Sequence, residues 1–250
     1  EKICSLANRN FGIGFDQLLQ IEKASSPEAD FNYRIFNTDG SEVEHCGNGA
    51  RCFATYVYEK NLSDRNPIKV KTLNRMLSLK INKNGSVCVD MGTPELNPKN
   101  IPFITGEEKI LHKREVKIGG EVRELEFVPL SMGNPHAVIF VEDLENTAVE
   151  DIGEALGDHS DFPNGVNVGF AEIHSGSEIR LRVFERGAGE TLACGTGACA
   201  AVVAGRLLHK LDAKVKAILT GGELDIEWEK EMSVLMTGPT KTVYEGTIDL

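Results

Sequence analysis

Two segments of the chain repeat apolar residues every three or four positions, which is the period of one buried face of a helix. They cover residues 48–60 and 196–210. Shorter segments with a similar pattern cover residues 148–156 and 3–7. The pattern therefore predicts few helices, of which the first two are the clearest.

Much of the remaining chain alternates apolar and polar residues, which is the period of a strand with one buried face. Turns are expected at glycines, which adopt a positive φ without strain. The predicted turns are Asn84-Gly85, Gly119-Gly120 and Gly221-Gly222, and the predicted strands are residues 31–36, 68–72, 77–81, 86–90, 136–141, 178–184, 224–228 and 243–248. We therefore expect an α/β protein of the α+β type, rich in antiparallel strands.

The two clearest helical segments follow the same local sequence. Residues 34–50, RIFNTDGSEVEHCGNGA, align without a gap to residues 182–198, RVFERGAGETLACGTGA, 148 positions further on. The identical positions are Arg34 with Arg182, Phe36 with Phe184, Glu42 with Glu190, Cys46-Gly47 with Cys194-Gly195, and Gly49-Ala50 with Gly197-Ala198. An internal repeat of this kind predicts two pseudo-symmetric domains, with one cysteine from each facing a shared cleft.

Length and charge are compatible with two domains and exclude some partners. A chain of 250 residues has room for two cores of about 100–150 residues each, and residues 92–102 form the expected linker. Acidic residues outnumber basic ones by 38 to 27, so no basic stripe is expected to bind nucleic acid. No stretch approaches the roughly 18 apolar residues that would span a membrane. We expect a cytoplasmic protein with a small-molecule substrate.

Each repeated cysteine directly precedes a predicted helix. Unpaired backbone N–H groups and the positive end of the helix dipole favour an anion there. This position is expected to lower the thiol pKa from its usual value of about 8.5. The glycines that follow each cysteine let a carboxylate or phosphate approach the backbone N–H groups.

Six cysteines are also compatible with other roles. A disulfide framework is not expected in an acidic chain of this length without secretory features. A zinc site usually has tighter spacing than Cys46 with Cys52 or Cys194 with Cys199. The four cysteines outside the repeat, Cys4, Cys52, Cys88 and Cys199, are interpreted as small buried apolar residues.

Two symmetry-related thiols suit one class of reaction best. A cysteine hydrolase needs one thiol with a histidine base, and a redox pair would place both sulfurs in one short motif. Inversion at a carbon atom needs one base on each face of the substrate, and a second thiol meets that need. The two thiols would then share one proton, so that their titrations are coupled.

The same segments resemble the two signature segments of the diaminopimelate epimerase family. The similarity extends along nearly the whole chain, through GFDQLL at 14–19, MGNPHAV at 132–138 and NGVNVGF at 164–170. It implies an isomerase that interconverts LL- and meso-diaminopimelate in lysine and peptidoglycan precursor biosynthesis, with neither metal nor organic cofactor. It also implies a homodimer.

The resemblance further implies two domains, residues 1–93 with 240–250 and residues 94–239. Each would be a curled mixed or antiparallel sheet, or a barrel, around a central helix. A final strand near 240–250 would return to the first domain. The family's N-terminus, which supplies a substrate-binding asparagine, precedes the position of Glu1, so we expect a further N-terminal segment outside the given sequence.

Carried over residue by residue, the resemblance makes Cys46 and Cys194 the acid–base pair. Backbone amides at Gly47, Asn48, Gly195 and Thr196 would hold the carboxylate at the reacting carbon. The other implied substrate contacts are Gln17, Asn37, Asn134, Asn167, Glu185 and Arg186. Each of these has a structural alternative, since asparagines next to glycine form turns and Glu185 with Arg186 could be an exposed pair.

The resemblance places His136 near the thiols, where it could assist in charging one of them, but a structural role stays open. The remaining histidines have no ligand-like spacing and are interpreted as surface or turn residues: His45, His112, His159, His174 and His209. Two other functions also stay open. A proline or hydroxyproline racemase would use paired thiols without needing Arg186, and a non-catalytic binding module would need neither thiol to titrate.

Overall fold

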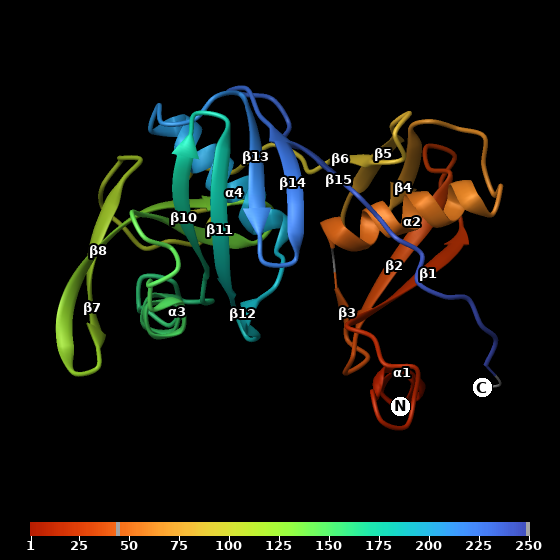
Figure 1. The fold of residues 1–250 in the computed structure, drawn as a ribbon, viewed down its shortest axis with the longest axis horizontal. Coiled ribbons are helices and arrows are strands. Elements are labelled where there is room, and N and C mark those ends of the chain that lie inside the picture. Colours follow the sequence, from red (N-terminus) through yellow and green to blue (C-terminus); the bar gives the residue numbers. More distant parts are fainter. Residues whose placement is uncertain (44–45, 249–250) are drawn as a thin grey trace. The chain divides into compact units, whose positions relative to one another are not determined.

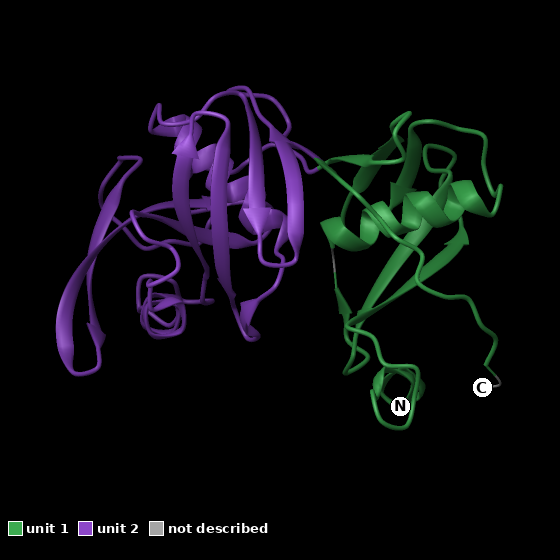
Figure 2. Cartoon of the chain, in the orientation of Figure 1, with its two compact units in different colours: residues 1–90, 237–250 green, residues 91–236 purple. Residues whose placement is uncertain are grey.

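The computed structural model describes residues 1–43 and 46–248. The chain divides into two compact units, residues 1–90 with 237–250 and residues 91–236 (Figure 2). We call them unit 1 and unit 2 and describe each by itself. His45 and the last two residues of the predicted 240–250 strand lie outside the described residues.

Unit 1 contains a mixed sheet with one long helix against it (Figure 1). The strands follow the order β1-β2-β4-β5-β6, with β3 beside β2. Their bounds are β1 (Gln17–Lys23), β2 (Phe31–Asn37), β3 (Glu42–Val43), β4 (Ile68–Lys71), β5 (Met76–Ile81) and β6 (Val87–Asp90). The helices are α1 (Lys2–Ala7) and α2 (Gly47–Glu59), and α2 packs on β1, β5 and β6.

Unit 2 repeats this plan and adds strands at one edge. Its order is β14-β13-β11-β10-β9-β8-β7, with β12 beside β11. The bounds are β7 (His112–Ile118), β8 (Glu121–Ser131), β9 (Pro135–Val141), β10 (Asn167–Ser175), β11 (Glu178–Glu185), β12 (Gly189–Thr191), β13 (Lys214–Leu219) and β14 (Gly222–Glu227). The helices are α3 (Val149–Gly157) and α4 (Gly195–Leu207), and β15 (Leu235–Gly238) spans the point where the chain passes back to unit 1.

The two units share one connectivity. In unit 1, β1 runs antiparallel to β2, β2 parallel to β4, and β4 antiparallel to β5. In unit 2, β10, β11, β13 and β14 repeat these three pairings in the same order. Helices α2 and α4 are both 13 residues long and start 148 positions apart, as the sequence repeat does. The predicted α+β fold with an internal repeat is therefore confirmed.

The central helices differ in how completely they are covered. In α2, Phe53 packs its ring 4.8 Å from that of Tyr33, whereas Tyr56 and Tyr58 on the other face are exposed. In α4, every residue except Thr196, Arg206 and Leu207 is buried. The expectation of one buried face is thus too narrow for α4. Its alanines and glycines are small enough for strands to approach on several sides.

The predicted turns all join strands. Asn84-Gly85 lies between β5 and β6, and Gly119-Gly120 lies between β7 and β8. One residue separates β13 from Gly221, and Gly222 begins β14. Gly85, Gly120 and Gly222 have positive φ angles of 82°, 88° and 141°. Several of the described strands have no predicted counterpart: β1, β3, β7, β8, β10, β12, β13 and β15. The first five residues of β10 are all buried, so the strand lacks the apolar–polar alternation of a half-exposed strand.

The prediction of a strand at 243–248, and of a final strand near 240–250, is wrong for the described residues. This segment forms no strand, and Val243 and Ile248 are exposed. Side-chain contacts attach it to α2 instead. The hydroxyls of Thr55 and Thr240 are 2.7 Å apart, and the Thr242 hydroxyl donates to Glu59 at 2.9 Å. An alternating pattern forms a strand only where a neighbouring strand edge accepts it.

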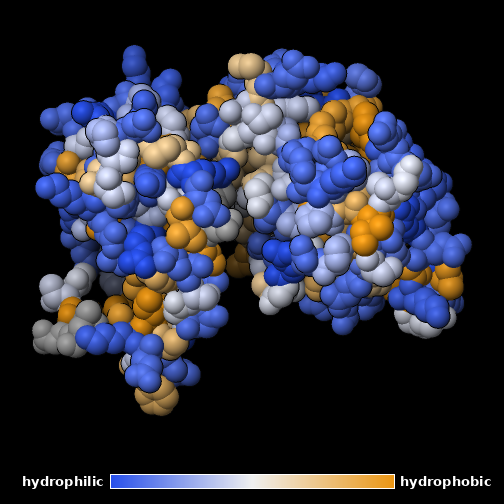
Figure 3. Space-filling model, turned by 180° about the vertical axis from the view of Figure 1, so that it is seen from behind, coloured by the Kyte–Doolittle hydropathy of each residue, from blue (hydrophilic) through white to orange (hydrophobic). Residues whose placement is uncertain are grey.

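The face shown in Figure 3 is mainly hydrophilic. Apolar areas appear as separate patches on the face shown. Among the described residues, no helix combines the length and the apolar composition needed to cross a membrane.

We expect Phe53→Ala to lower the free energy of unfolding by about 3–5 kcal/mol, because it leaves a cavity beside Tyr33 and Phe31. Urea unfolding followed by circular dichroism measures this, and hydrogen exchange of the α2 amides localises it. Phe11→Ala is the matched control. Its ring is 91% exposed, so its loss should change stability by no more than about 0.5 kcal/mol. Equal effects of the two substitutions would contradict the assigned core.

Candidate active site

The first thiol site lies at the start of α2. The strands β2 and β3 pair antiparallel, and the chain then reaches Cys46, which is the N-cap of the helix. Cys46 has an extended backbone, and its half-buried Sγ accepts a hydrogen bond from the Gly49 N–H at 3.3 Å. A Cβ on Gly49 would lie 2.5 Å from the Tyr33 hydroxyl. Glycine is therefore required at this position for the close packing of the helix start.

The second thiol site lies at the start of α4. Cys194 is the N-cap, and only 4% of its surface is exposed. Its thiol donates to Glu185 Oε2 at 3.2 Å, and the Thr196 hydroxyl lies 3.5 Å from the sulfur. The Thr191 hydroxyl donates to the other oxygen, Glu185 Oε1, at 2.5 Å. The carboxylate is thus held between a hydroxyl and the thiol, which marks Cys194 as protonated.

Burial raises the pKa of both thiols, so the expectation of lowered values is wrong for the ligand-free protein. For Cys46, the N–H groups of Gly49 and Asn48 and the charge of Arg51 oppose the effect of burial only in part. For Cys194, burial and then the negative charge of Glu185 raise the pKa to about 12. The helix start favours the thiolate as predicted, but loss of water around the sulfur costs more.

Gln17 and Asn37 are brought together at one end of the β1–β2 pair in unit 1. They are cross-strand partners in β1 and β2, and Gln17 Nε2 donates to Asn37 Oδ1 at 3.2 Å. Gly47 and Asn48 form the first two positions of α2. The Asn48 side chain accepts a hydrogen bond from Arg51 at 3.1 Å, so one of its polar atoms is already used within the helix.

Four predicted residues lie together in unit 2. Asn167 on β10 is paired in register with His136 on the parallel strand β9. Its side chain donates to the Pro135 carbonyl at 2.8 Å and accepts from the Arg186 backbone N–H at 3.0 Å. Asn134 Oδ1 lies 3.1 Å from His136 Nε2. The cluster fixes the backbone beside Glu185, while the Arg186 guanidinium donates to the Asn164 carbonyl at 2.6 Å.

His136 is neutral in this environment. Burial, with a smaller contribution from the charge of Arg186, lowers its pKa to about 3. A carboxamide oxygen only accepts hydrogen bonds, so the contact with Asn134 places the ring proton on Nε2. The buried Nδ1 is then an acceptor with no hydrogen-bond partner among the described residues.

Sequence reasoning missed two residues that influence the thiol sites through a charge or a hydrogen bond. Arg51 lies five positions after Cys46, inside the first turns of α2, where its charge favours the Cys46 thiolate. Thr191 lies three positions before Cys194 on the short strand β12. The matching position in the first repeat is Val43, so the repeat gave no signal for the Thr191 hydroxyl.

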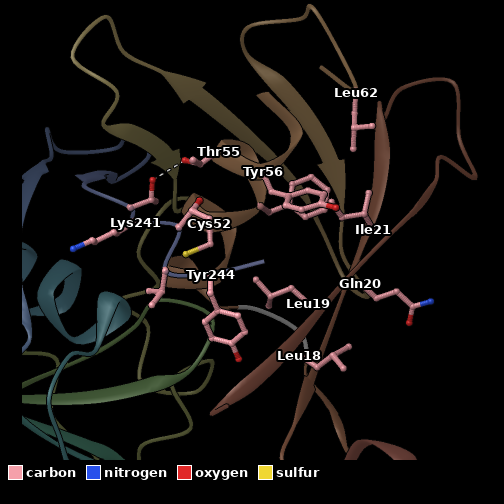
Figure 4. A pocket seen from close by; sticks show the side chains of 14 residues that line it. Leu18, Leu19, Gln20, Ile21, Cys52, Thr55, Tyr56, Leu62, Lys241 and Tyr244 are labelled. Carbon is pink, nitrogen blue, oxygen red and sulfur yellow. Dashed lines mark hydrogen bonds between the residues drawn. The ribbon is translucent and has the colours of Figure 1, made fainter. Parts of the chain in front are cut away.

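A cavity of about 710 Å³ in unit 1 does not contain the predicted site residues. Leu18, Leu19, Tyr56 and Tyr244 surround it, and Cys52 lines it (Figure 4). Its lining is mainly apolar and includes neither Cys46 nor Asn37. The predicted chemistry therefore lies at the helix starts rather than in this cavity.

The other roles considered for the cysteines find no support in the contacts. The cysteines all lie among the described residues and none forms a disulfide: Cys4, Cys46, Cys52, Cys88, Cys194 and Cys199. Cys4 and Cys52 are exposed and Cys88 is half-buried, so only Cys199 fits the buried interpretation given to these four. Within residues 1–43 and 46–248, no group of three or more His, Cys, Asp or Glu side chains could hold a metal ion.

Comparison with known proteins places the chain in a family. The family model for diaminopimelate epimerase matches residues 1–97 and 128–243. The chain belongs to the diaminopimelate epimerase family. A diaminopimelate epimerase of Cupriavidus metallidurans is 52% identical over 250 residues, which cover 98% of this chain and 87% of that protein. The corresponding protein of Cupriavidus pinatubonensis is 50% identical over the same shares.

Solved structures with the same fold are more distant in sequence. A hydroxyproline epimerase from Agrobacterium vitis has a TM-score of 0.66 and 16% identity, covering 95% of this chain and 77% of that one. A probable proline racemase from Agrobacterium radiobacter has a TM-score of 0.64 and 16% identity, covering 99% and 81%. At this identity the likeness shows the fold alone, and it agrees with the two-unit repeat of this member of the diaminopimelate epimerase family.

We expect both thiols to react with iodoacetamide more slowly than a small-molecule thiol at pH 8, since only the thiolate attacks and its pKa is raised. Cys46 should react faster than Cys194, whose reactivity rises only toward a pKa of about 12. Mass spectrometry of the two cysteine peptides between pH 7 and 10 measures both rates.

The variant Glu185→Gln tests the assigned cause. Removal of the carboxylate charge lowers the pKa of Cys194, so this thiol should be alkylated severalfold faster at pH 8. The rate at Cys46 should stay unchanged. Faster alkylation of Cys194 than of Cys46 in the unaltered protein, or no response of Cys194 to Glu185→Gln, would contradict this account.

We also expect His136 to stay neutral across the physiological range, because its pKa is about 3. Nitrogen NMR shifts of its ring should therefore not change between pH 5 and 8. A His136→Gln variant assigns the resonance. A titration of His136 with a midpoint in this range would show that its ring is not desolvated as described.

Proposed function

We propose that this chain is a pyridoxal-independent epimerase that interconverts LL-2,6-diaminopimelate and meso-diaminopimelate. This reaction would be a step in the biosynthesis of lysine and of peptidoglycan precursors. The observation that carries the proposal is the duplicated thiol: in each unit, a cysteine is the N-cap of the central helix. Membership of the diaminopimelate epimerase family supports the substrate.

Cys46 and Cys194 are the proposed acid–base pair. To invert a carbon, one group removes the α-proton and another returns a proton to the opposite face. We infer that both thiols act on the same substrate carbon from its two sides. With substrate bound, the two sulfurs then hold one proton between them. In a turnover the thiolate takes the α-proton and becomes a thiol, while the other thiol gives its proton to the opposite face of the carbon and becomes a thiolate.

Both thiols have raised pKa values in the ligand-free protein, and the contacts of each sulfur suggest which one ionises when substrate binds. Cys194 donates to Glu185, so its sulfur carries a proton. Cys46 instead accepts from a backbone N–H, and the charge of Arg51 favours its ionised form. We infer that Cys46 acts first as base and Cys194 first as acid, and that the reverse reaction exchanges these roles.

The α-carboxylate is the proposed ligand of the two helix starts, at Gly47-Asn48 and Gly195-Thr196. Removal of the α-proton moves negative charge onto this carboxylate, and backbone N–H groups aimed at it stabilise the transition state by roughly 3–4 kcal/mol for each donor. The same N–H groups cost no reorganisation, because the helices hold them in place.

The polar residues around the thiols are proposed to select the substrate. Arg186 has donors for a second carboxylate, and Glu185 can accept from an ammonium group when the thiol turns away. Gln17, Asn37, Asn134 and Asn167 supply amide groups for the remaining polar atoms. His136 Nδ1 offers an uncharged acceptor, so we propose that it assists through hydrogen bonding rather than as a charged acid.

The alternatives are not favoured. A proline or hydroxyproline racemase shares the fold, as the Agrobacterium structures illustrate, but at 16% identity. The diaminopimelate epimerases of Cupriavidus are about 50% identical over nearly the whole chain. A non-catalytic module would not need a hydrogen-bonded carboxylate beside a buried thiol.

Three properties of the working enzyme follow from the family resemblance and belong to the proposal. We propose that it acts in the cytoplasm, without metal or organic cofactor, and as a homodimer. Light scattering of the purified protein and activity in the presence of a chelator test the last two.

We expect the purified protein to exchange the α-hydrogen of LL-diaminopimelate with deuterated solvent and to form the meso isomer. Cys46→Ala and Cys194→Ala should each lower epimerisation by about 10²–10⁴-fold, since each removes one acid–base group. Proton NMR follows the exchange, and chiral chromatography follows the isomers.

Cys88→Ala is the matched control, because Cys88 is also half-buried in unit 1 but lies on β6, outside the thiol site. It should keep full activity. Full activity in both alanine variants at the thiol sites would disprove the two-base assignment. Turnover of proline or hydroxyproline in place of diaminopimelate would support the alternative racemase.

A further inference from the structure

The sequence repeat preserves an arginine and a glutamate that the proposed chemistry does not use. Arg34 matches Arg182, and Glu42 matches Glu190. In unit 1, Arg34 donates to both carboxylate oxygens of Glu42, at 2.9 and 2.8 Å. In unit 2, Arg182 donates to both oxygens of Glu190 at 2.7 Å. The repeat therefore keeps a two-point ion pair in both units.

Each pair joins the strand before the thiol to the short strand that leads to it. Glu42 lies on β3 and is paired with Phe36 on β2, which lies two residues beyond Arg34. Glu190 lies on β12 and is paired with Phe184 on β11, which lies two residues beyond Arg182. In both units the cysteine follows the glutamate by four residues. The pair thus fixes the direction in which the chain leaves the hairpin toward the helix start.

Each arginine also anchors its hairpin to a neighbouring element of the same unit. Arg34 Nη1 lies 3.4 Å from Glu22 Oε1 on β1. Arg182 donates to the carbonyls of Leu144 and Thr147, in the loop that precedes α3. The short strand is therefore held to more than one part of its unit, although β3 pairs with only two residues of β2.

Exposure argues against a mainly stabilising role. The side chains of Arg34 and Glu42 are 41% and 24% exposed, and those of Arg182 and Glu190 are 26% and 23% exposed. Ion pairs with this much water contact contribute little to stability. Two parallel hydrogen bonds between planar groups do, however, restrict orientation. Such a pair therefore acts mainly by fixing the orientation of the two side chains and of the strands that carry them.

The residues between the arginine and the cysteine differ where the local chemistry differs. Glu185, which binds the Cys194 thiol, occupies the position of Asn37 in the first repeat, and Thr191 occupies that of Val43. The ion pair is therefore common to two sites with unlike surroundings. The ion pair is therefore part of the hairpin structure that precedes the thiol in both units.

We propose that Arg34–Glu42 and Arg182–Glu190 are matched positioning pairs, each of which sets the placement of the one thiol that follows it. Cys46 depends on the first pair and Cys194 on the second. The consequence for turnover rests on the proposed function, whereas the consequence for thiol reactivity does not.

Separate alkylation of the two cysteines tests this assignment. In the full-length protein, Glu42→Gln keeps the side-chain size but removes the charge and one matching acceptor. It should raise the iodoacetamide rate of Cys46 severalfold at pH 8, because a less firmly positioned thiol is more accessible to water. The rate of Cys194 should stay unchanged. Glu190→Gln should give the reverse pattern, and the conservative variants Arg34→Lys and Arg182→Lys should follow their own pairs.

The ion pair between Arg114 and Asp161 provides the matched control. It also lies in unit 2, with side chains 19% and 24% exposed, but in neither thiol site. Asp161→Asn should alter neither alkylation rate nor turnover. By contrast, each glutamate variant should lower kcat on the order of tenfold, with a smaller change in KM, because a displaced base loses its alignment with the substrate.

The outcomes separate the possible explanations. A change in alkylation rate at only the matching cysteine supports the positioning role. This holds even if neither the variants nor the unaltered protein epimerises diaminopimelate, an outcome that would contradict the proposed function alone. Changes of equal size at both cysteines, or no change at either in the Gln and Lys variants, would overturn the proposal. A fall in kcat for Asp161→Asn equal to that for Glu190→Gln would overturn it as well.

Discussion

Two opposing electrostatic effects meet at each sulfur atom, and the fold determines their balance. The start of a helix favours a thiolate, while removal of water favours a thiol. Each unit folds its sheet against the helix that the cysteine caps, so the packing that aims backbone N–H groups at the sulfur also excludes solvent from it. In the ligand-free protein the second effect is the larger, and both thiols have raised pKa values.

Much of this arrangement could be predicted from the sequence because it depends on local patterns. The apolar period of α2 and α4 placed both helices within three residues of their observed bounds. The ungapped repeat then predicted two units of similar connectivity, and it located Cys46 and Cys194 as N-caps. Gln17 with Asn37, and Asn134 with His136 and Asn167, were implied as neighbours of the substrate, and each set lies together within its own unit.

The features that escaped prediction depend on contacts between distant residues. The bond from Cys194 to Glu185 requires the β11–β12 hairpin to fold back on the helix start, and no pattern in the sequence measures how far the sulfur is buried. The strand expected at 243–248 had the right alternation but no strand edge to join. Residues such as Arg51 and Thr191 act through single hydrogen bonds or charges, which leave no periodic signal.

Because residues 237–248 pack against α2, unit 1 is assembled from the two ends of the chain, with unit 2 inserted between them. During synthesis on the ribosome, all of residues 91–236 emerge before the segment that completes unit 1. Unit 2 has its full sequence available first, whereas unit 1 waits for residues 237–248. The apolar surface of α2 near Thr55 is therefore uncovered in the nascent chain, and this is the stage at which a chaperone would have most to bind.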